Sequence, residues 1–356
     1  MTIAVIAPDS FKGSLSAHEA ADAIADGWRS VRPDDELVLL PQADGGEGTL
    51  DAVEAAVTGA VRRSAGLVTG PDGRPVSAQW LELPDGTAVL ELAQSSGLPL
   101  MTRPDPVGAT TRGLGEVIRS AAESGMTRFV VGLGGSASTD GGAGALAALG
   151  LELVDEQGEL VADGGRGLSR IVGARLDHLQ ATGPMTLLTD VTAPLLGPTG
   201  AAAVFGPQKG ASPDEVRELE AALHHFAELL GGDPSAAGSG AAGGTAYGLA
   251  TVLHAAIVPG ADYIAELTGL TAAIERADVL LTGEGSFDAQ SHGGKVVGQL
   301  LASADVTIGV IAGRVESESG VWTASLTELA GSTESAMGDA ATWLRAAGAK
   351  AARELG

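Results

Sequence analysis

The chain has 356 residues, of which 44% are hydrophobic and only 3% aromatic, and its 45 acidic and 21 basic side chains give a formal net charge of −24. Such a charge disfavours nucleic acid and anionic lipid as partners, although solubility alone would also account for it. The absence of cysteine excludes disulfides, thiolate catalysis and Cys-ligated zinc. The length favours two domains, and the sequence shows neither a basic leader nor an apolar run of membrane-spanning length, so we expect a cytoplasmic protein.

The N-terminal pattern indicates a parallel sheet covered by helices. It predicts strand 3–8, helix 16–28, strand 36–41 and helix 47–57. Ser16 is the expected N-cap of the first helix, and Glu19 completes a capping box. Strands that alternate with helices are typical of the parallel α/β class.

The pattern changes over residues 61–100, where apolar and polar residues alternate between turns, which predicts an antiparallel meander and a domain change near residue 62. Later elements are expected as helices at 111–124, 141–149, 213–230, 244–256, 295–303 and near 335–354, and strands at 128–133, 185–189, 277–283 and 306–313. We therefore predict an α/β protein in which residues 1–62 and 270–356 form one discontinuous domain around an inserted second α/β domain, 63–269.

The stretch GLGGSASTDGGAGALAALG, residues 132–150, contains seven glycines between an apolar strand and an alanine-rich helix. A glycine-rich turn before a helix presents backbone N–H groups that suit an anion. The candidate phosphate contacts are Gly134, Gly135, Ser136, Ser138, Thr139 and Gly141. Asp140 is expected to be the N-cap of a helix that begins at Gly141. A tight connection that binds no ligand is the alternative.

Two nucleotide-binding motifs are relevant to this loop. The Walker pattern GxxxxGK[ST] is absent from the sequence. A dinucleotide pattern GxGxxA matches at Gly132, Gly134 and Ala137, with Glu152 twenty residues after Gly132, but glycine-rich chains produce this match by chance. Asp140 would repel a bare pyrophosphate, which favours a Mg²⁺-bound phosphate over NAD.

The first two strands are followed by loops with charged residues at the sheet edge where α/β proteins bind ligands. Asp9, Ser10 and Lys12 follow the first strand, and Asp44 and Glu47 follow the second. Carboxylates beside a lysine suit phosphoryl chemistry, because Mg²⁺ takes one or two carboxylates together with phosphate oxygens. An Asp/Ser turn with a surface lysine, and an N-cap at Asp44, are the structural alternatives.

Two later segments also carry candidate groups. Asp190 ends an apolar strand and Lys209 follows a Gly-Pro turn, so that the aspartate could orient or deprotonate a hydroxyl while the lysine offsets negative charge. Glu284 and Asp288 are expected after the strand 277–283, as a metal-ligand pair, and Lys295 at the next helix start as a phosphate contact. Purely structural roles are the alternative for Asp190 and Lys209.

Taken together, seven segments resemble the bacterial type I glycerate kinase family. They are IAPDSFKGSLSA, ADGGEGT, GLGGSASTDGGAGA, TDVTAPLLGPTGA, VFGPQKGA, GAAGG and LTGEGSFDAQ, and they occur in family order over essentially the whole chain. The resemblance implies Mg²⁺-dependent transfer of the ATP γ-phosphate to D-glycerate, usually at the 2-hydroxyl. It also implies a discontinuous Rossmann-like domain and a second α/β domain with the active site between them.

The chain departs from the family pattern at Ser286, where the family often has arginine, and at Ala193, where it has asparagine. Lys12, Arg112 or Arg314 could take over from that arginine.

The resulting hypothesis assigns roles to the candidate residues. Catalysis is assigned to Asp190, Lys12 and Asp44, and Mg²⁺ binding to Asp44, Glu284 and Asp288. ATP binding is assigned to the glycine-rich loop and Lys295, and substrate binding to Asp9, Ser10, Lys12, Arg112, Lys209 and Arg314. A 3-phosphoglycerate product, a nicotinamide-dependent dehydrogenase and a non-catalytic binding protein are the alternatives, and a homodimer is left open.

Overall fold

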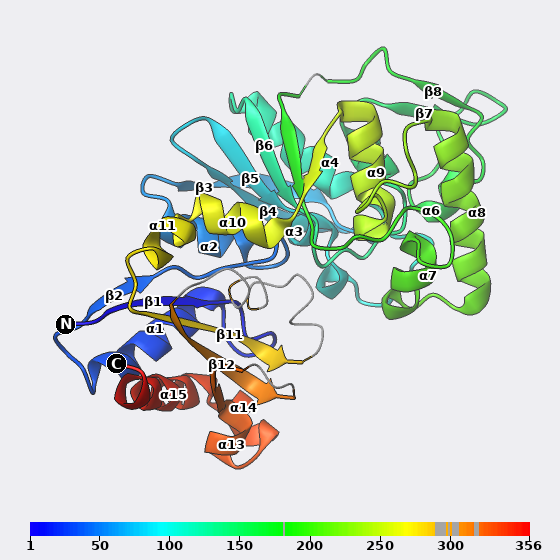
Figure 1. Ribbon diagram of the computed structural model, residues 1–356. Helices are drawn as coiled ribbons and strands as arrows, with labels where there is room; N and C mark the ends of the chain where they lie inside the picture. The colour runs from blue at the N-terminus through cyan, green and yellow to red at the C-terminus, as the bar shows by residue number, and fades with distance from the viewer. Residues whose placement is uncertain (181, 289–296, 298–299, 301–305, 317–319) are drawn as a thin grey trace. The chain divides into compact units, whose positions relative to one another are not determined.

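The computed structural model describes the chain except residues 181, 289–296, 298–299, 301–305 and 317–319 (Figure 1). Its contacts divide into two compact units. Unit 1 comprises Met1–Asp44, Asp51–Thr58 and Ala261–Gly356, and unit 2 comprises Gly45–Leu50 and Gly59–Gly260. The domain boundaries near 62 and 270 stay predictions from the sequence.

Unit 1 contains a five-stranded sheet in the order β13-β12-β11-β1-β2, with every neighbouring pair parallel. The strands are β1 (Ile3–Pro8), β2 (Glu36–Leu39), β11 (Val279–Phe287), β12 (Thr307–Val315) and β13 (Trp322–Ser325). Alternate residues of β1 are buried on opposite faces. Ala4 and Ile6 pack in the cluster of α1 and α15, and Val5 and Ala7 pack with Ala261 and Leu270 of α10 and α11. Both faces of the sheet are thus covered, as parallel sheets require.

Among its described residues, the helices of this part of the chain are α1 (Ala17–Arg29), α2 (Thr49–Ala56), α10 (Gly260–Leu267), α11 (Leu270–Ile274), α13 (Leu326–Ala330), α14 (Thr333–Gly338) and α15 (Ala340–Glu354). The predicted capping box of α1 is confirmed, because Ser16 Oγ accepts from the Glu19 amide at 3.2 Å and the Glu19 carboxylate accepts from the Ser16 amide at 2.9 Å. A Cβ at Gly27 would overlap the Arg345 carbonyl, so glycine allows α1 and α15 to touch backbone to backbone.

Several element boundaries in unit 1 differ from the sequence prediction. β11 runs to Phe287, four residues beyond the expected end, because it pairs with β12 as far as Val315. The single helix expected near 335–354 is two helices, since Asp339 has non-helical angles and caps α15 through the Thr342 amide. Strand β13 was not predicted. The predicted helix 295–303 lies mostly outside the described residues.

Unit 2 contains a six-stranded sheet in the order β10-β9-β6-β5-β4-β3. Its strands are β3 (Val61–Thr69), β4 (Pro75–Glu82), β5 (Thr87–Glu91), β6 (Arg128–Gly132), β9 (Met185–Leu188) and β10 (Ala256–Val258). The pairs β3–β4 and β4–β5 are antiparallel, and the remaining pairs are parallel. A separate antiparallel pair is formed by β7 (Glu152–Val154) and β8 (Gly173–Arg175). The predicted class, α/β with mostly parallel sheets, is confirmed.

The longest helices in the described part of unit 2 are α8, α9 and α4, and the others are short (Figure 1). In chain order, the helices of this described part are α3 (Ala93–Ser96), η1 (Leu98–Leu100), α4 (Arg112–Glu123), α5 (Ala143–Ala148), α6 (Gly165–Leu168), α7 (Ala201–Phe205), η2 (Pro207–Lys209), α8 (Pro213–Leu230) and α9 (Ala241–Leu253). The core of this unit includes Trp80, Phe129 and Phe226, each almost fully buried. No helix of the described residues is long and apolar enough to cross a bilayer.

Candidate active site

The glycine-rich loop follows β6, the central parallel strand of unit 2, and leads into α5. Its first part lies against the segment 45–46, because the Gly134 amide donates to the Gly45 carbonyl at 3.1 Å. A Cβ at Gly134 would overlap the Gly46 Cα, so only glycine permits this approach. Gly135 has φ 76° and is exposed, whereas the five residues that follow it are buried. The loop therefore presents one glycine to solvent.

Neighbouring backbone holds this loop on both sides. Ala137 donates to the Ser96 carbonyl and Leu98 donates to the Gly135 carbonyl, both at 2.9 Å. Among the residues that the structure describes, the amides of Gly135, Ser136, Ser138 and Thr139 donate to no acceptor. A fixed turn with N–H groups left over for a ligand is what an anion site requires.

The hydroxyls of Ser138 and Thr139 differ from the expectation that they reach a phosphate. Both side chains are fully buried, and their oxygens have no hydrogen-bond partner among the described residues. In the loop it is the backbone at the exposed Gly135, rather than these two hydroxyls, that an anion can reach. Their roles as ATP contacts stay predictions.

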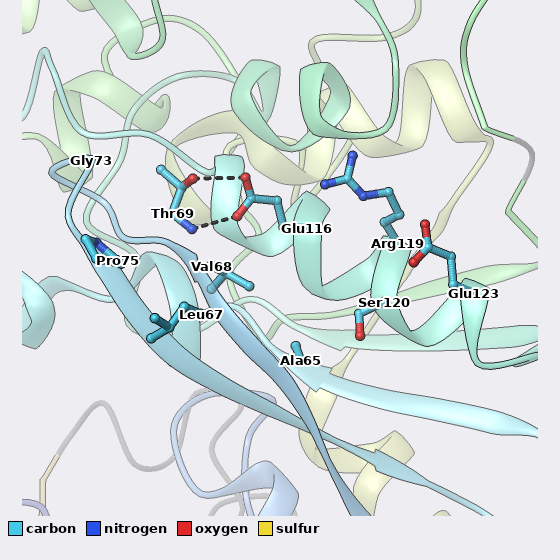
Figure 2. A pocket seen from close by; sticks show the side chains of 10 residues that line it. All are labelled: Ala65, Leu67, Val68, Thr69, Gly73, Pro75, Glu116, Arg119, Ser120 and Glu123. Atoms are coloured by element: carbon cyan, nitrogen blue, oxygen red, sulfur yellow. Dashed lines mark hydrogen bonds between the residues drawn. The ribbon is translucent and has the colours of Figure 1, made fainter.

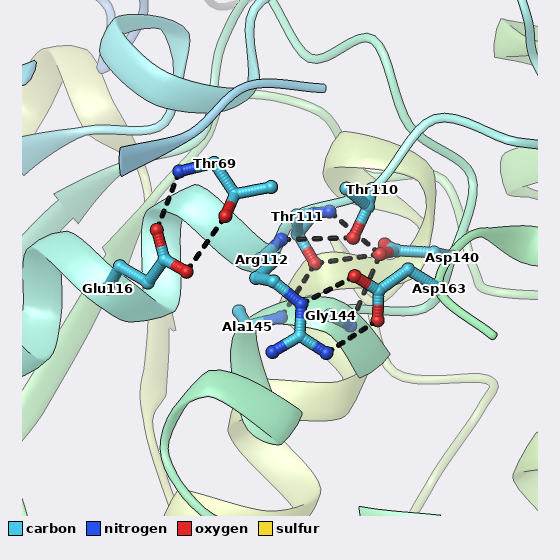
Figure 3. A network of polar contacts seen from close by, with 9 residues as sticks. All are labelled: Thr69, Thr110, Thr111, Arg112, Glu116, Asp140, Gly144, Ala145 and Asp163. Carbon is cyan, nitrogen blue, oxygen red and sulfur yellow. Dashed lines mark hydrogen bonds and ion pairs between the residues drawn. The ribbon is translucent and has the colours of Figure 1, made fainter. Parts of the chain in front are cut away.

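Asp140 is fully buried and faces the protein interior (Figure 3). Its Oδ2 accepts from the amide and hydroxyl of Thr111, both at 2.8 Å, and from the Gly144 amide at 3.3 Å, while Oδ1 accepts from the Gly142 amide at 3.1 Å. Burial raises the pKa of Asp140, and these hydrogen bonds oppose the shift. The predicted N-cap was wrong in position: α5 begins at Ala143 after Gly142, whose φ is 79°.

Lys209 ends the short helix η2 and is buried, with only 3% of its surface exposed. Its ammonium donates to Ser136 Oγ at 2.9 Å and to the Ser138 carbonyl at 2.5 Å. Burial lowers the pKa of Lys209 to about 7, and the charge of Asp140 acts in the opposite direction. The ammonium is therefore directed into the loop. Its predicted contact with substrate is not shown and stays a prediction.

Two other predicted residues of unit 2 also have protein partners. Asp190 follows β9, and its Oδ1 accepts from the Gly260 amide at 2.9 Å. Arg112 begins α4 and forms a bidentate ion pair with Asp163, at 2.5 and 2.7 Å, which raises the pKa of the guanidinium (Figure 3). These contacts hold both side chains in place. Catalysis by Asp190 and substrate binding by Arg112 stay predictions.

In unit 1, carboxylates gather at the carboxyl ends of β1, β2 and β11. The Asp9 amide donates to the Gly283 carbonyl at 2.8 Å, which ties the loop after β1 to β11. Burial, together with the negative charges of Asp44 and Glu284, raises the pKa of Asp9 to about 7, against a hydrogen bond from the Ser10 amide. Glu284 lies inside β11 and is buried, so the expectation that it follows the strand was wrong.

The remaining predicted residues of unit 1 lie around these carboxylates. Lys12 is exposed in a turn closed by Phe11 and Leu15, and its backbone nitrogen would be 3.6 Å from a Cβ at Gly285. Ser286 pairs in register with Arg314, whose exposed guanidinium lies 3.5 Å from Glu316. Asp288 directly follows β11. Lys295 lies outside the described residues.

Pockets in unit 2 also lie beside α4 and beside α5, at the end of the glycine-rich stretch. One, of about 490 Å³, lies between β3, β4 and α4, where Thr69 donates its amide and hydroxyl to Glu116 at 2.6 and 2.9 Å (Figure 2). The other, of about 280 Å³, is lined in part by Arg112, Asp163 and His178. Arg112 is the one predicted site residue that lines either of these two pockets.

Sequence reasoning did not single out Thr111, Ser96 or Gly243, which support the loop. Thr111 is 29 residues from Asp140, and no local signal pairs them. A Cβ at Gly243 would overlap the Ser138 carbonyl, and Ala242, Gly243 and Gly244 all have left-handed angles at the start of α9. The GAAGG segment was the available signal, but it was used only for the resemblance.

A parallel α/β fold with a glycine-rich loop and carboxylates at the strand ends has the arrangement of a ligand-binding α/β enzyme. The family model described as the glycerate kinase family matches residues 4–356. The chain therefore belongs to the glycerate kinase family, as the resemblance indicated, and is an enzyme of this type.

The chain is similar to individual members as well. A glycerate kinase from Bacillus subtilis (strain 168) is 42% identical over 329 residues, which cover 88% of this chain and 86% of the relative. A glycerate 2-kinase from Escherichia coli (strain K12) is 43% identical over 303 residues, or 82% and 79% of the two chains. The crystal structure of a protein provisionally assigned as glycerate kinase 2 from Salmonella typhimurium LT2 matches with a TM-score of 0.84 and 37% identity, covering 99% of this chain and 98% of that one.

Proposed function

We propose that the chain transfers the γ-phosphate of ATP to D-glycerate, at the 2-hydroxyl, to give 2-phosphoglycerate. The observation that carries this proposal is the family match over residues 4–356. The choice of the 2-hydroxyl is supported by the similarity to the relative named glycerate 2-kinase. Because the chain has a net charge of −24, the site must bind two anionic substrates against a repulsive field.

The glycine-rich loop is the proposed cradle for the ATP phosphates. The exposed Gly135, whose amide has no acceptor among the described residues, and the neighbouring Ser136 amide support this role. Backbone N–H groups bind phosphate oxygens without a long side chain that must be ordered, and they carry no charge that could be lost on titration. Asp140 does not oppose this binding directly, because its carboxylate is turned inward and held by four donors.

The carboxylates of unit 1 are the proposed ligands of Mg²⁺. Their chemistry fits the ion, because Mg²⁺ in phosphoryl-transfer sites takes one or two carboxylates and completes its shell with phosphate and water oxygens. The pKa of Asp9 is raised by burial and by repulsion from Asp44 and Glu284, and that repulsion is the second observation, since a cation would relieve it. Within the described ranges, no group of three His, Cys, Asp or Glu side chains is placed to hold a metal ion by itself. Asp44, Glu284 and Asp288 would therefore hold the ion together with oxygen atoms of the substrate.

Asp190 is the proposed group that orients the attacking hydroxyl, and Asp44 is the rival. One oxygen of Asp190 is fixed by the Gly260 amide, which holds the carboxylate in place at the end of β9. Lys12 and Arg314 are exposed cations of unit 1 that can bind the glycerate carboxylate or offset charge on the transferred group, with Asp9 and Ser10 beside Lys12 in the chain. In such a reaction positioning and charge neutralisation provide most of the rate acceleration.

ADP release tests the proposal. With ATP and Mg²⁺ present, ADP release should depend on D-glycerate and should not be supported by 3-hydroxypropionate, which lacks the 2-hydroxyl. Lys12→Ala should fold normally, because the side chain is exposed, and should lose at least about tenfold in turnover. ADP release that is independent of any hydroxy acid would contradict the proposed acceptor, and near-normal turnover of Lys12→Ala would remove that residue from the site.

A further inference from the structure

Lys209 connects two segments that are far apart in the sequence. Its Nζ is 2.9 Å from Ser136 Oγ and 2.5 Å from the Ser138 carbonyl, across 73 and 71 residues. Both acceptors belong to the glycine-rich loop, on either side of Ala137, whose amide is already held by the Ser96 carbonyl. The ammonium thus fixes the part of the loop that follows the exposed Gly135.

The position of Lys209 is unfavourable for direct contact with a substrate. The residue is 3% exposed, and two of the three donors on its ammonium are used inside the protein. Burying an ammonium costs free energy that neutral acceptors only partly return, so an apolar side chain of similar length would serve stability as well or better. A buried charge in this place is therefore better explained by what it does to the loop.

We propose that Lys209 is a positioning residue, whose ammonium holds the 136–138 backbone in the shape that binds the phosphates of ATP without touching either substrate. This inference rests on the proposed role of the loop as the phosphate cradle. It differs from the sequence prediction, in which Lys209 binds substrate itself.

The chemistry of Lys209 gives the proposal a second signature. Burial lowers its pKa to about 7, and Asp140, held by Thr111, Gly142 and Gly144, is the charged group that acts on it among the described residues. A neutral amine still donates, but it loses the charge that strengthens its hydrogen bond to the Ser138 carbonyl. The loop should therefore be held less firmly as the pH rises through the neutral range.

Lys209→Met is the direct test, and Lys350→Met is the matched control, since Lys350 lies on α15 over the ring of Trp322. In nucleotide-free protein, hydrogen exchange of the segment 134–142 should accelerate roughly tenfold or more in Lys209→Met, with little change elsewhere. The KM for ATP should rise by about tenfold while the KM for D-glycerate changes less than about threefold. Lys350→Met should change none of these values.

The pH dependence separates positioning from a merely structural role. In the wild type the KM for ATP should increase as the pH rises through about 7, and this inflection should be absent from Lys209→Met. The titration of ATP itself is common to both proteins and so cancels in the comparison. Ser136→Ala, which removes one acceptor and leaves the lysine in place, should change exchange and ATP affinity in the same direction by a smaller factor, and it provides the test if Lys209→Met does not fold.

Three results would overturn the proposal. Unchanged loop exchange together with an unchanged KM for ATP would show that Lys209 does not position the loop. If only the KM for D-glycerate rose, Lys209 would contact the substrate itself, as the sequence predicted. Accelerated exchange with unchanged ATP affinity would show that the lysine holds the loop but that the loop does not bind phosphate, so the proposed cradle would be wrong as well.

Discussion

Thr111 donates both its amide and its hydroxyl to one oxygen of Asp140, at 2.8 Å each, and so joins the N-cap of α4 to the glycine-rich loop 29 residues away (Figure 3). The same hydroxyl accepts from the Ala145 amide at 3.0 Å. The only acid of the loop is thereby turned away from the surface and used to fix the start of α5. This arrangement reconciles a carboxylate with a loop proposed to bind anions.

Replacement of Asp140 by asparagine should destabilise the protein strongly. The amide group would place a donor against N–H groups that now donate to a carboxylate, so a loss of about 2–4 kcal/mol in the free energy of unfolding is expected. Urea unfolding at neutral pH measures it. Asp163→Asn is the matched control, because its partly exposed ion pair with Arg112 should contribute about 1 kcal/mol or less. Equal losses in the two variants would contradict the account of Asp140.

Gly134→Ala should affect both stability and ATP binding. The added Cβ would overlap the Gly46 Cα, and backbone must move to relieve it, at a cost of about 1–3 kcal/mol. Because the loop begins at this residue, the KM for ATP should rise as well. Gly338→Ala on α14 is the control, since no atom lies within 4 Å of a Cβ there. If the two variants had the same stability and the same KM, the close approach would have no role.

The effect of Asp9 on stability should depend on pH. The folded protein keeps Asp9 protonated up to about pH 7, whereas the unfolded chain releases this proton near pH 3.9. Between these values the folded state binds more protons, so Asp9 lowers the free energy of unfolding progressively as the pH rises from about 4 to 7. Asp9→Asn should therefore gain stability relative to the wild type over this range.

The size of the gain follows from the same shift. Three pKa units set an upper limit of about 4 kcal/mol, and the partial exposure of the side chain makes a smaller value the expectation. Denaturant unfolding at pH 4.5 and pH 8 measures the difference, with Asp22→Asn on the exposed face of α1 as the control. A stability difference between Asp9→Asn and wild type that does not change with pH would show that burial and the charges of Asp44 and Glu284 do not act on Asp9 as described.

Asp190→Asn should fold like the wild type and lose activity. Asparagine keeps an oxygen that can accept from the Gly260 amide, so the turn after β9 should survive. It cannot act as a base, and a loss of at least about a hundredfold in kcat is expected with little change in the KM for ATP. Steady-state kinetics measures both quantities. A variant that kept more than a tenth of the wild-type rate would transfer this role to Asp44, the rival.

Local signals in the sequence were sufficient for much of the fold. The capping box of Ser16 and Glu19 marked the start of α1, and alternation within 61–100 marked the antiparallel strands β3 to β5. The predicted ends of helices and strands were wrong where tertiary contacts determine them. β11 extends to Phe287 because β12 continues beside it, and the last helix breaks at Asp339, whose side chain caps α15 instead of continuing the helix.

The site was predicted less completely than the fold, for a physical reason. Residue type and position at a strand end pointed to the loop and to Asp9, Asp44 and Glu284. The direction of a side chain depends on partners far away in the sequence, as for Asp140 with Thr111 and Lys209 with Ser136. The spacing of residues along the sequence does not reveal that the carboxylate of Asp140 and the ammonium of Lys209 point into the protein interior.

The phosphorus NMR spectrum of the product formed from ATP, Mg²⁺ and D-glycerate tests the central claim most directly. The account predicts equal amounts of ADP and a phosphomonoester whose phosphorus couples to the single proton on C2, as in 2-phosphoglycerate. Coupling to the two protons on C3 would keep the kinase and correct the hydroxyl. A spectrum in which ATP is unchanged, or yields only inorganic phosphate, would contradict the claim.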